Sequence, residues 1–375
     1  MRLPWLFAPA VFSDDVYRYV WEGRVWAAGL NPFAYGPADP ALAALHDTAL
    51  HASNAAIWAQ VNHPELSSIY PPVAQGLFVV LAPGGVLAWK LLAAAADVGT
   101  VALLTRGAWA GAGRSGWLWA LLPLPALESA GSGHLEAVGV FCMVGALTSA
   151  QPGLKPAASS SWAILFAWVG AMIKLLPAAT LLPLLRTRRA CVLVVGATLI
   201  ASLPILAAGP HLIAGFEAYR QHWTFNGSAY PLLAWAFERV PVDVLDLASE
   251  DPARSLLQVV GAGVVAGSAW RLRRRPPAEM AAGLSMVTTA AFVLLSPTVH
   301  PWYVLWPLAA ALATRAQLVA LPWVLAGVLA PFAYRVLGTL HDGVWQEQAG
   351  TRWVVWLPVW LALGVVSCRS RPPVE

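Results

Sequence analysis

Long apolar runs alternate with short polar segments along almost the whole chain, a pattern that predicts membrane-spanning helices. A transmembrane helix needs roughly 20 residues, yet several runs are shorter, and Pro and Gly break them near 83–85, 123–125 and 174–177. Short broken helices at membrane depth line a cavity or lie buried in protein; the alternative is a set of ordinary kinked spans. We expect an all-α polytopic membrane protein with about ten transmembrane helices, some short or broken. The apolar runs lie near 72–83, 86–105, 116–127, 134–150, 161–185, 190–208, 254–270, 280–297, 302–314, 317–333 and 353–367.

The composition supports a membrane protein and argues against a soluble domain, a nucleic-acid-binding protein and a cysteine-bound metal site. Hydrophobic residues make up 58% of the 375 positions and charged residues only 11%. Soluble domains carry about 25% charged residues, so this chain cannot cover a water-facing surface. The net charge of +4 does not require nucleic acid as a partner, because the basic residues gather in loops. The three cysteines have no metal-ligand spacing, and we expect neither a metal nor a cofactor.

The basic residues predict how the chain is oriented, because cytoplasmic loops carry an excess of Lys and Arg. The intervening loops are then extracytoplasmic, and the longest, 13–70, is amphipathic and suited to the membrane surface. This arrangement fits the inner membrane of a bacterium. We treat 1–375 as one integral-membrane domain whose first transmembrane helix is truncated, since the apolar segment 1–12 is too short to span a bilayer. The basic clusters are Arg106 and Arg114, Lys155, Arg186 with Arg188 and Arg189, Arg271 with Arg273, Arg274 and Arg275, Arg315, and Arg369 with Arg371.

The stretch FSDDVYRYVWEGR gathers ionisable groups at the start of this first outer loop. On a helix that begins there, Asp15, Arg18 and Glu22 share one face at spacings i, i+3 and i+7. A structural interpretation is that the preceding Ser or Asp caps the helix, whose macrodipole favours the carboxylates. A functional interpretation places one of the adjacent carboxylates in a cavity, because neighbouring side chains on a helix diverge by about 100°. The two interpretations are compatible.

Further ionisable residues stand in apolar surroundings, where an unpaired charge is costly. Lys174 lies inside an apolar run, so it either binds a phosphate in a cavity or snorkels to an interface. Lys90 and Asp97 are seven residues apart on one helical face, which favours a structural pairing. His134 and Glu136 follow a glycine-rich turn and are candidates for binding hydroxyl groups or assisting a base. Their i, i+2 spacing on a helix start argues against a shared metal ion.

Two aromatic positions at the ends of apolar runs have a similar ambiguity. His300, in the sequence HPWY, either belongs to an interfacial aromatic belt or donates a hydrogen bond over a bound substrate. Tyr70, just before two prolines, either marks the entry into the membrane or contributes to a site.

A set of motifs occurs in order over most of the chain: SDDVYRYVWEGRVWAAGLNPFAYGPADPAL, SSIYPPVAQGLF, SAGSGHLEAVGVF, MIKLLPAATLLPLL, WTFNGSAYPLL and SPTVHPWYVLWPL. Together they resemble the bacterial integral-membrane glycosyltransferases of the GT-C superfamily, mannosyltransferase-like enzymes that use polyprenyl-phosphate sugars. The order is more specific than any single motif, and it is more specific to the superfamily than to a substrate. In YVWEGR a glutamate stands where relatives commonly have aspartate.

The resemblance implies an inverting transfer of a hexose, expected to be mannose, from a polyprenyl-phosphate donor to a glycolipid or envelope-glycan acceptor outside the cytoplasm. It also implies an acidic residue of the first outer loop as general base. The chemistry supports this role, because the acceptor hydroxyl loses its proton as it attacks. Asp15 is the first candidate for the base and Asp14 the second. The departing phosphate needs cations, and the candidates are Arg18, Arg24 and Lys174.

Two other classes of function are weighed against this one. A transporter or flippase of lipid-linked sugars also has broken helices and intramembrane charges. Such a protein should show an internal repeat, which the sequence lacks, and should concentrate ionisable residues at the bilayer centre rather than on one side. A non-catalytic scaffold of an envelope assembly would have no need for the acidic pair Asp14 and Asp15.

Overall fold

The structure of the 375-residue chain, a computed structural model, describes residues 2–10, 12–46, 52–107, 113–151, 156–239, 251–314, 317–340 and 346–369. This described part is helical, without named strands, and has two isolated bridges that join Phe225 and Asn226 to Thr298. The predicted all-α class is therefore confirmed. Lys155, Arg315 and Arg371 of the basic clusters lie outside the described residues.

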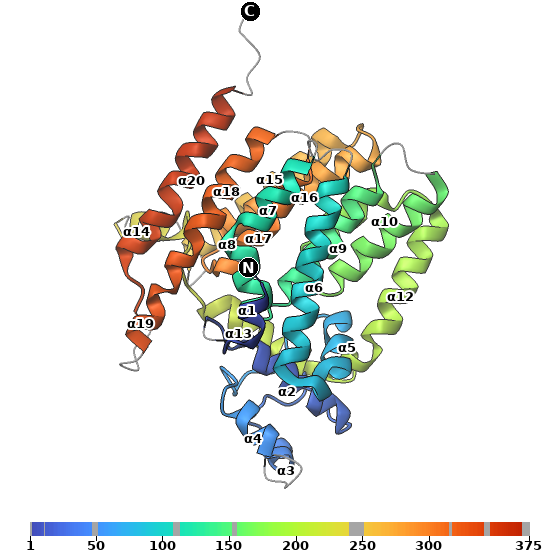
Figure 1. The fold of residues 1–375 in the computed structure, drawn as a ribbon, viewed down its shortest axis with the longest axis vertical. Coiled ribbons are helices and arrows are strands. Elements are labelled where there is room, and N and C mark those ends of the chain that lie inside the picture. The colour runs from blue at the N-terminus through green and yellow to red at the C-terminus, as the bar shows by residue number, and fades with distance from the viewer. Residues whose placement is uncertain are drawn as a thin grey trace, which may run out of the picture.

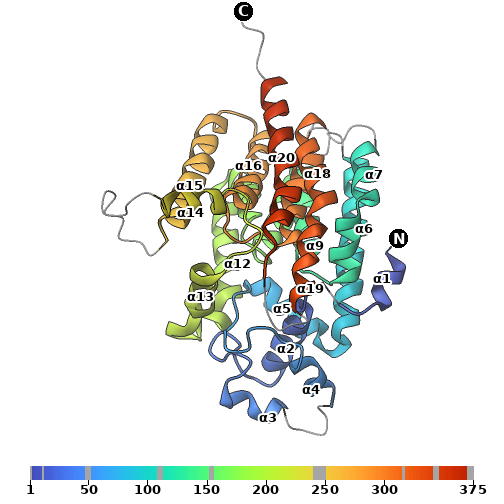
Figure 2. The ribbon, with the colours of Figure 1, turned by 90° about the vertical axis from the view of Figure 1, so that its left-hand side faces the viewer.

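Six candidate spans in the described residues are long and apolar enough to cross a membrane. The last turns of α6, α15 and α20 and the first turn of α12 all lie at the upper end of the molecule (Figures 1 and 2). These turns hold Arg106, Arg188, Arg271 and Arg369, so the basic residues gather at one end of the bundle. The candidate spans are built on α5 (Pro72–Leu81) with α6 (Gly85–Arg106), α12 (Arg188–Leu206), α15 (Pro252–Leu272), α16 (Pro277–Leu295), α18 (Leu321–Leu329) with the adjoining 3₁₀ segments, and α20 (Ala349–Arg369).

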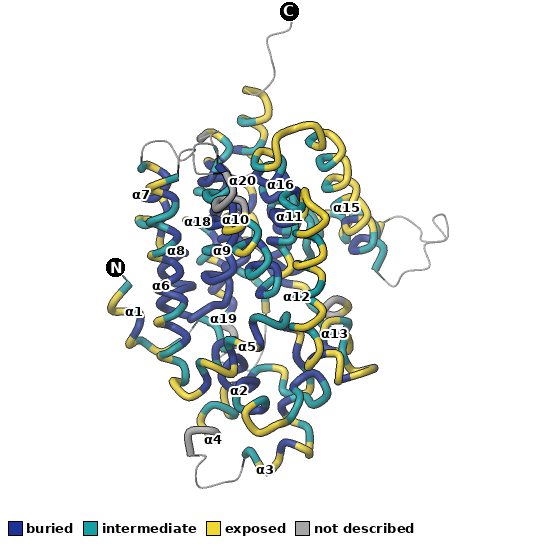
Figure 3. The backbone as a smooth tube through the Cα atoms, turned by 90° about the vertical axis from the view of Figure 1, so that its right-hand side faces the viewer, coloured by how far each residue is buried: buried dark blue, intermediate teal, exposed yellow. Residues whose placement is uncertain are grey.

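The outermost spans expose apolar side chains, as lipid-facing helices do. Along α12 and α15 the backbone is largely exposed or half-buried in Figure 3, although both sequences are strongly apolar. In water such faces would be costly, whereas lipid tails solvate them. The exposed residues on α12 include Val192, Leu193, Val195, Leu199, Ile200 and Leu203.

Shorter helices fill the interior and both ends of the bundle. Prolines divide the run 116–127 into two helices, and the run 161–185 breaks around Lys174, as the sequence predicts. The core of the bundle is built on α9 and α17, whose side chains are almost all buried. The predicted number of about ten spans remains a prediction.

The shorter helices are α1 (Leu3–Phe7), α2 (Asp15–Ala27), α3 (Ala43–His46), α4 (Ala52–Trp58), α7 (Arg114–Leu121), α8 (Pro123–Ala126), α9 (Glu136–Ser149), α10 (Pro156–Ala171), α11 (Ala178–Leu181), α13 (Ala214–His222), α14 (Tyr230–Phe237), α17 (Leu305–Leu312) and α19 (Leu337–Leu340). One π-helical segment, Leu127–Gly131, and 3₁₀ segments at Pro40–Leu42, Ala82–Gly84, Leu182–Leu184, Gly209–Ile213, Pro301–Val304, Gln317–Ala320 and Ala330–Val336 connect them.

The first loop folds over the end of the bundle opposite the basic clusters. There α2, α3, α4 and α5 lie below the long helices (Figures 1 and 2). The apolar run 72–83 forms a separate arm, α5, because a 3₁₀ turn follows this helix and Gly85 has the left-handed φ of +59°. Glycine adopts such a conformation without strain. The arm therefore packs against α2 at the bundle end instead of continuing directly into α6.

The short N-terminal segment is held by two charged residues of α6, Lys90 and Asp97. Lys90 donates hydrogen bonds to the carbonyl oxygens of Trp5 and Ala8 at the end of α1, and Asp97 forms an ion pair with Arg2. The predicted structural role is therefore right, but the two residues pair with the N-terminal segment and not with each other.

The contact between α2 and α5 yields a stability prediction at Gly23. A Cβ atom at this position would lie 2.1 Å from the backbone carbonyl oxygen of Phe78. Gly23→Ala should therefore separate the two helices and lower the free energy of unfolding by about 1–3 kcal/mol, the usual cost of overpacking, despite the better helix propensity of Ala. Thermal unfolding in lipid nanodiscs measures this loss. The control is Gly76→Ala on α5, where a Cβ atom meets nothing within 4 Å; equal melting temperatures for both variants would contradict the prediction.

Candidate active site

The acidic pair lies at the start of α2, where a neighbouring loop fixes both carboxylates. Asp14 occupies the N-cap position, but its side chain does not cap the helix and instead accepts a hydrogen bond from the Asn62 amide. The same amide donates to Oδ1 of Asp15 at 3.3 Å. The other oxygen of Asp15, Oδ2, lies 3.8 Å from Nδ1 of His134, and 23% of the Asp15 side chain is exposed. Asp15 is thus the member of the pair that faces the bundle.

His134 lies at the centre of a cluster of buried carboxylates. Its Nε2 atom is 3.5 Å from Oε2 of Glu128, and its Nδ1 atom is 3.8 Å from Oε2 of Glu136. The imidazole is completely buried and stacks on Trp302 with a centroid distance of 3.9 Å. The turn before it requires Gly133, which has a φ of +71° and whose Cβ position would crowd a neighbouring side chain at 3.2 Å. These contacts hold the ring between Asp15 and Glu128.

Lys174 provides the cation of the site. Its Nζ atom lies 2.6 Å from Oε1 of the fully buried Glu136 and 5.3 Å from the ring centroid of Tyr303. About a quarter of the side chain, 26%, is exposed. The hydroxyl of Tyr303 lies 2.9 Å from that of Tyr219 on α13. The interfacial snorkelling interpretation is therefore wrong for Lys174, because its ammonium group is paired inside the site.

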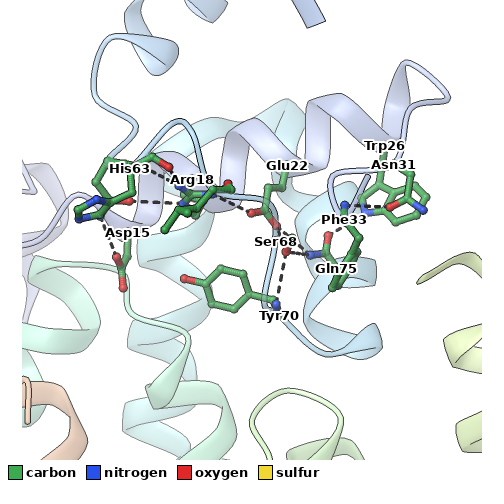
Figure 4. A network of polar contacts seen from close by, with 12 residues as sticks. Asp15, Arg18, Glu22, Trp26, Asn31, Phe33, His63, Ser68, Tyr70 and Gln75 are labelled. Carbon is green, nitrogen blue, oxygen red and sulfur yellow. Dashed lines mark hydrogen bonds and ion pairs between the residues drawn. The ribbon is translucent and has the colours of Figure 1, made fainter. Parts of the chain in front are cut away.

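Arg18 binds the backbone of the first loop. Its guanidinium donates to the backbone carbonyls of residues 62, 63 and 66, and it forms an ion pair with Glu22 at 3.5 Å. Glu22 in turn accepts hydrogen bonds from Ser68 at 2.6 Å and Gln75 at 2.8 Å, and Figure 4 shows this network along α2. In this structure the N–H groups of Arg18 are bound to the loop that holds the acidic pair, and its role as a phosphate ligand stays a prediction.

Arg24 is not brought to the acidic pair. It follows Asp15 by nine residues on one continuous helix, which corresponds to about 13.5 Å along the axis and to the opposite side of the helix. The structure therefore does not bring Arg24 together with Asp15, and the role of Arg24 as a phosphate ligand stays a prediction.

Tyr70 and His300 both lie close to the site. Tyr70 is buried in an aromatic cluster, with its ring 5.3 Å from that of Tyr19, and Figure 4 shows its hydroxyl pointing toward Asp15. His300 stacks on the face of Trp302 with a centroid distance of 4.3 Å. The rings of His134, Trp302 and His300 are therefore stacked in series. Such an ordered stack is not what residues of an interfacial aromatic belt require, since each of those only has to lie at the membrane surface.

Sequence reasoning missed Glu128, Asn62 and Trp302 as site residues. Glu128 is completely buried and accepts a hydrogen bond from the Tyr334 hydroxyl at 2.7 Å. A signal for it exists, since an acid inside the apolar run LPLPALESAG should have a partner or a function. Asn62 carries no such signal, because it lies in a polar loop and acts only through the fold.

The electrostatics of the bundle end suit a carboxylate base beside a cation. Burial raises the pKa of Asp15 above its usual value of 3.8, and the charges of Asp14 and Glu136 add to that rise, while His134 and Lys174 oppose it. A carboxylate with a raised pKa is a stronger base than an exposed one. A reacting hydroxyl at Asp15 and an anion at Lys174 would therefore both be stabilised.

The described residues hold no group of three or more His, Cys, Asp or Glu side chains arranged to bind a metal ion. The i, i+2 spacing of His134 and Glu136 does not separate their side chains: Nδ1 of His134 lies 3.8 Å from Oε2 of Glu136, whose other oxygen is paired with Lys174.

Comparisons with known proteins point to a family. A family model described as "Alpha-(1->6)-mannopyranosyltransferase, N-terminal domain" matches residues 2–210, and one described as "MptB C-terminal domain" matches residues 244–364. The chain is 26% identical, over 349 aligned residues, to alpha-(1->6)-mannopyranosyltransferase B of Corynebacterium glutamicum; the match covers 81% of this chain and 56% of that relative. The chain thus spans little more than half the length of this relative, and no solved structure matches it.

These matches confirm the resemblance to mannosyltransferase-like membrane glycosyltransferases that the ordered motifs suggested. The first match alone covers more than half of the chain and includes Asp15, His134, Glu136 and Lys174. The chain belongs to the alpha-(1->6)-mannopyranosyltransferase family.

Proposed function

We propose that this protein transfers mannose from a polyprenyl-phosphate donor to a glycolipid or envelope-glycan acceptor, with inversion at the anomeric carbon. One observation carries the proposal: a partly exposed carboxylate and a partly exposed cation lie in the same cluster around the buried His134. The carboxylate is Asp15, next to His134, and the cation is Lys174, which forms its ion pair with Glu136. Family membership supports mannose as the sugar and an α-(1→6) bond as the linkage that is formed. The lipid-phosphate donor suits a site built at the end of a membrane bundle.

Asp15 acts as the general base in this mechanism. Its Oδ2 atom takes the proton of the acceptor hydroxyl as that oxygen forms a bond to the anomeric carbon and the bond from that carbon to the phosphate oxygen breaks. His134 holds a fixed position behind Asp15 through its stack on Trp302. A single displacement of this kind inverts the anomeric centre.

Lys174 stabilises the leaving phosphate. Negative charge grows on the departing oxygen in the transition state, and a preorganised cation in a site of low dielectric stabilises it strongly. The ion pair with Glu136 fixes the ammonium group in place, and the Tyr303 ring lies within reach of a cation–π contact. The polyprenyl chain of the donor would remain in the bilayer beside the exposed apolar helices.

We place the site on the extracytoplasmic side of a bacterial inner membrane. Its support is the positive-inside rule, because the ends of α6, α15 and α20 that carry Arg106, Arg271 and Arg369 lie opposite α2. The first loop, 13–70, would then be extracytoplasmic.

Reconstitution tests the proposed activity directly. The purified protein in lipid nanodiscs is incubated with polyprenyl-phosphate mannose and an α-(1→6)-linked mannose oligomer, and mass spectrometry follows the product. The expected product carries one additional hexose, and proton NMR should show an anomeric configuration opposite to that of the donor. Movement of the donor across a vesicle membrane without any sugar transfer would instead favour the transporter or flippase.

The raised pKa of Asp15 predicts the acidic side of the pH–rate profile. The base must be ionised, and burial keeps Asp15 protonated to a pH above its usual pKa of 3.8, so kcat/KM should fall below a midpoint that lies above this value. Because the charge of Asp14 raises the pKa of Asp15, Asp14→Asn should move this midpoint to lower pH. Rate profiles of the wild type and this variant measure the shift; an unchanged midpoint would contradict the electrostatic coupling.

Activity should also be independent of divalent metal ions. The proposed mechanism uses Asp15 and Lys174 in place of a Lewis acid, and the described residues offer no metal-binding group. Transfer rates in excess EDTA should therefore equal the rates without it. Loss of transfer with EDTA, restored by a divalent ion, would disprove metal independence.

A further inference from the structure

A second polar site lies beside the candidate active site, in a pocket of about 410 Å³ between α14, the connection that follows α16, and the start of α20. Tyr230 on α14 donates a hydrogen bond to Asp251 at the N-cap of α15, the end of that helix opposite its basic last turn. Its wall contains aromatic rings, two carboxylates and a guanidinium. The lining residues that matter here are Phe225, Tyr230, Trp235, Glu238, Glu347 and Arg352.

The floor of this pocket is fixed by the segment around Asn226. Asn226 has the left-handed φ of +47°, a conformation that asparagine adopts more readily than most other residues with a side chain. Its backbone N–H donates to Glu347 at 3.0 Å, its side-chain amide donates to the Val299 carbonyl at 3.2 Å, and its own carbonyl accepts from Trp356 at 2.8 Å. The floor is thus preorganised from three directions.

Glu347 and Arg352 form a neutral pair in the wall that still has capacity for hydrogen bonds, and the other carboxylate of the wall, Glu238, lies 4.0 Å from Arg239. Arg352 donates from Nε to Oε1 of Glu347 at 3.2 Å and from a terminal nitrogen to Oε2 at 2.8 Å. The two side chains are 26% and 21% exposed, so both can also reach a ligand. Because the pair cancels its own charge, it favours a neutral polyol over an anion or a cation.

Two buried polar atoms next to the pocket lack partners among the described residues. They are Oδ1 of Asn226, a residue that is 2% exposed, and Oγ1 of Thr351, which is 5% exposed. Both residues line a smaller adjoining pocket that shares Phe225 and Glu347 with the larger one. The smaller pocket is too narrow to hold a water molecule, so these two atoms belong to the packed boundary of the larger pocket and do not by themselves indicate a ligand.

We propose that this pocket binds the saccharide chain of the acceptor, an inference that rests on the proposed transferase activity. The rings of Tyr230 and Trp235 supply flat apolar surfaces for the C–H faces of sugar rings, while Glu347 and Arg352 bind their hydroxyls. A series of ring contacts leads from the pocket to the base. Phe225 lies 5.1 Å from His300, His300 stacks on Trp302, and Trp302 stacks on the histidine next to Asp15.

Direct binding measurements test the pocket without requiring turnover. An α-(1→6)-linked mannose oligomer is titrated into the full-length protein in nanodiscs, because sugar-headed detergents would compete for the pocket. Trp235→Ala removes an exposed ring and should not affect folding, and Glu347→Gln keeps the shape but removes the charge. Each should weaken binding by about tenfold, the loss of one good contact. In turnover, each should raise the acceptor KM by the same factor and leave the donor KM unchanged.

The matched control is Trp270→Ala. Trp270 is 66% exposed against 57% for Trp235, and each carries a stacked arginine, Arg273 and Arg239 respectively, but Trp270 lies at the opposite end of α15 from the pocket. The control should bind the oligomer as the wild type does. Wild-type binding by both pocket variants, or an equal rise of the donor and acceptor KM values, would overturn the proposal. If the protein transferred no sugar at all, the proposed transferase activity would be disproved. The binding titration would still show whether the pocket binds the saccharide.

Discussion

Asp15→Asn should reduce sugar transfer by about 10²–10⁴-fold, the usual contribution of a general base. Asparagine keeps the size of the side chain and can retain the contact with Asn62, but it cannot accept the proton of the attacking hydroxyl. Because the carboxylate is buried with a raised pKa, its removal should not destabilise the fold. Initial rates of mannose transfer in nanodiscs, at saturating donor and acceptor, measure the loss in kcat.

Two related variants show whether this loss belongs to catalysis. Asp39→Asn lies in the same loop, where the Asp39 side chain accepts a hydrogen bond from the backbone N–H of Ala41 at 2.8 Å. Asparagine can accept the same bond, so this variant should transfer at the wild-type rate. Asp15→Asn should also bind the donor as the wild type does. Wild-type turnover by a protein that carries both Asp14→Asn and Asp15→Asn would exclude the acidic pair as the base.

The sequence predicted the site well where a polar residue stands in an apolar run. His134, Glu136 and Lys174 stand in apolar surroundings, where an unpaired charge is costly, and Asp15 stands in the ionisable stretch that opens the first loop; the structure brings these four together. What the sequence could not show is which residue pairs with which. Lys174 neutralises Glu136 across a helix break, and no local spacing encodes that contact.

Arg18 and Arg24 on α2 show where the pattern along a helix does not predict which groups a side chain contacts. Because Arg18 follows Asp15 by three residues, the two are expected on the same face of the helix. The N–H groups of Arg18 nevertheless donate to backbone carbonyls of the loop 62–66. Helical geometry alone predicts that Arg24, nine residues after Asp15, points away from it. Asn62 orients both members of the acidic pair from a loop that no periodicity describes. Loop contacts of this kind depend on the tertiary fold.

Lys174→Met should lower kcat by about 10²–10³-fold, the usual effect of removing one preorganised group that stabilises developing charge. It should also lower the free energy of unfolding by about 3 kcal/mol, because it leaves the completely buried Glu136 without its partner. Transfer rates and thermal unfolding in nanodiscs measure the two effects separately. Lys174→Arg keeps the positive charge and should retain more activity than Lys174→Met.

The double variant Lys174→Met with Glu136→Gln separates the structural role of the pair from its role in transfer. Removing both charges eliminates the unpaired buried carboxylate, so most of the lost stability should return. Transfer should remain as slow as in Lys174→Met, since the leaving phosphate still lacks its cation. If transfer recovered together with stability, Lys174 would act only by holding Glu136 in the fold, and the phosphate would have to be stabilised by another group.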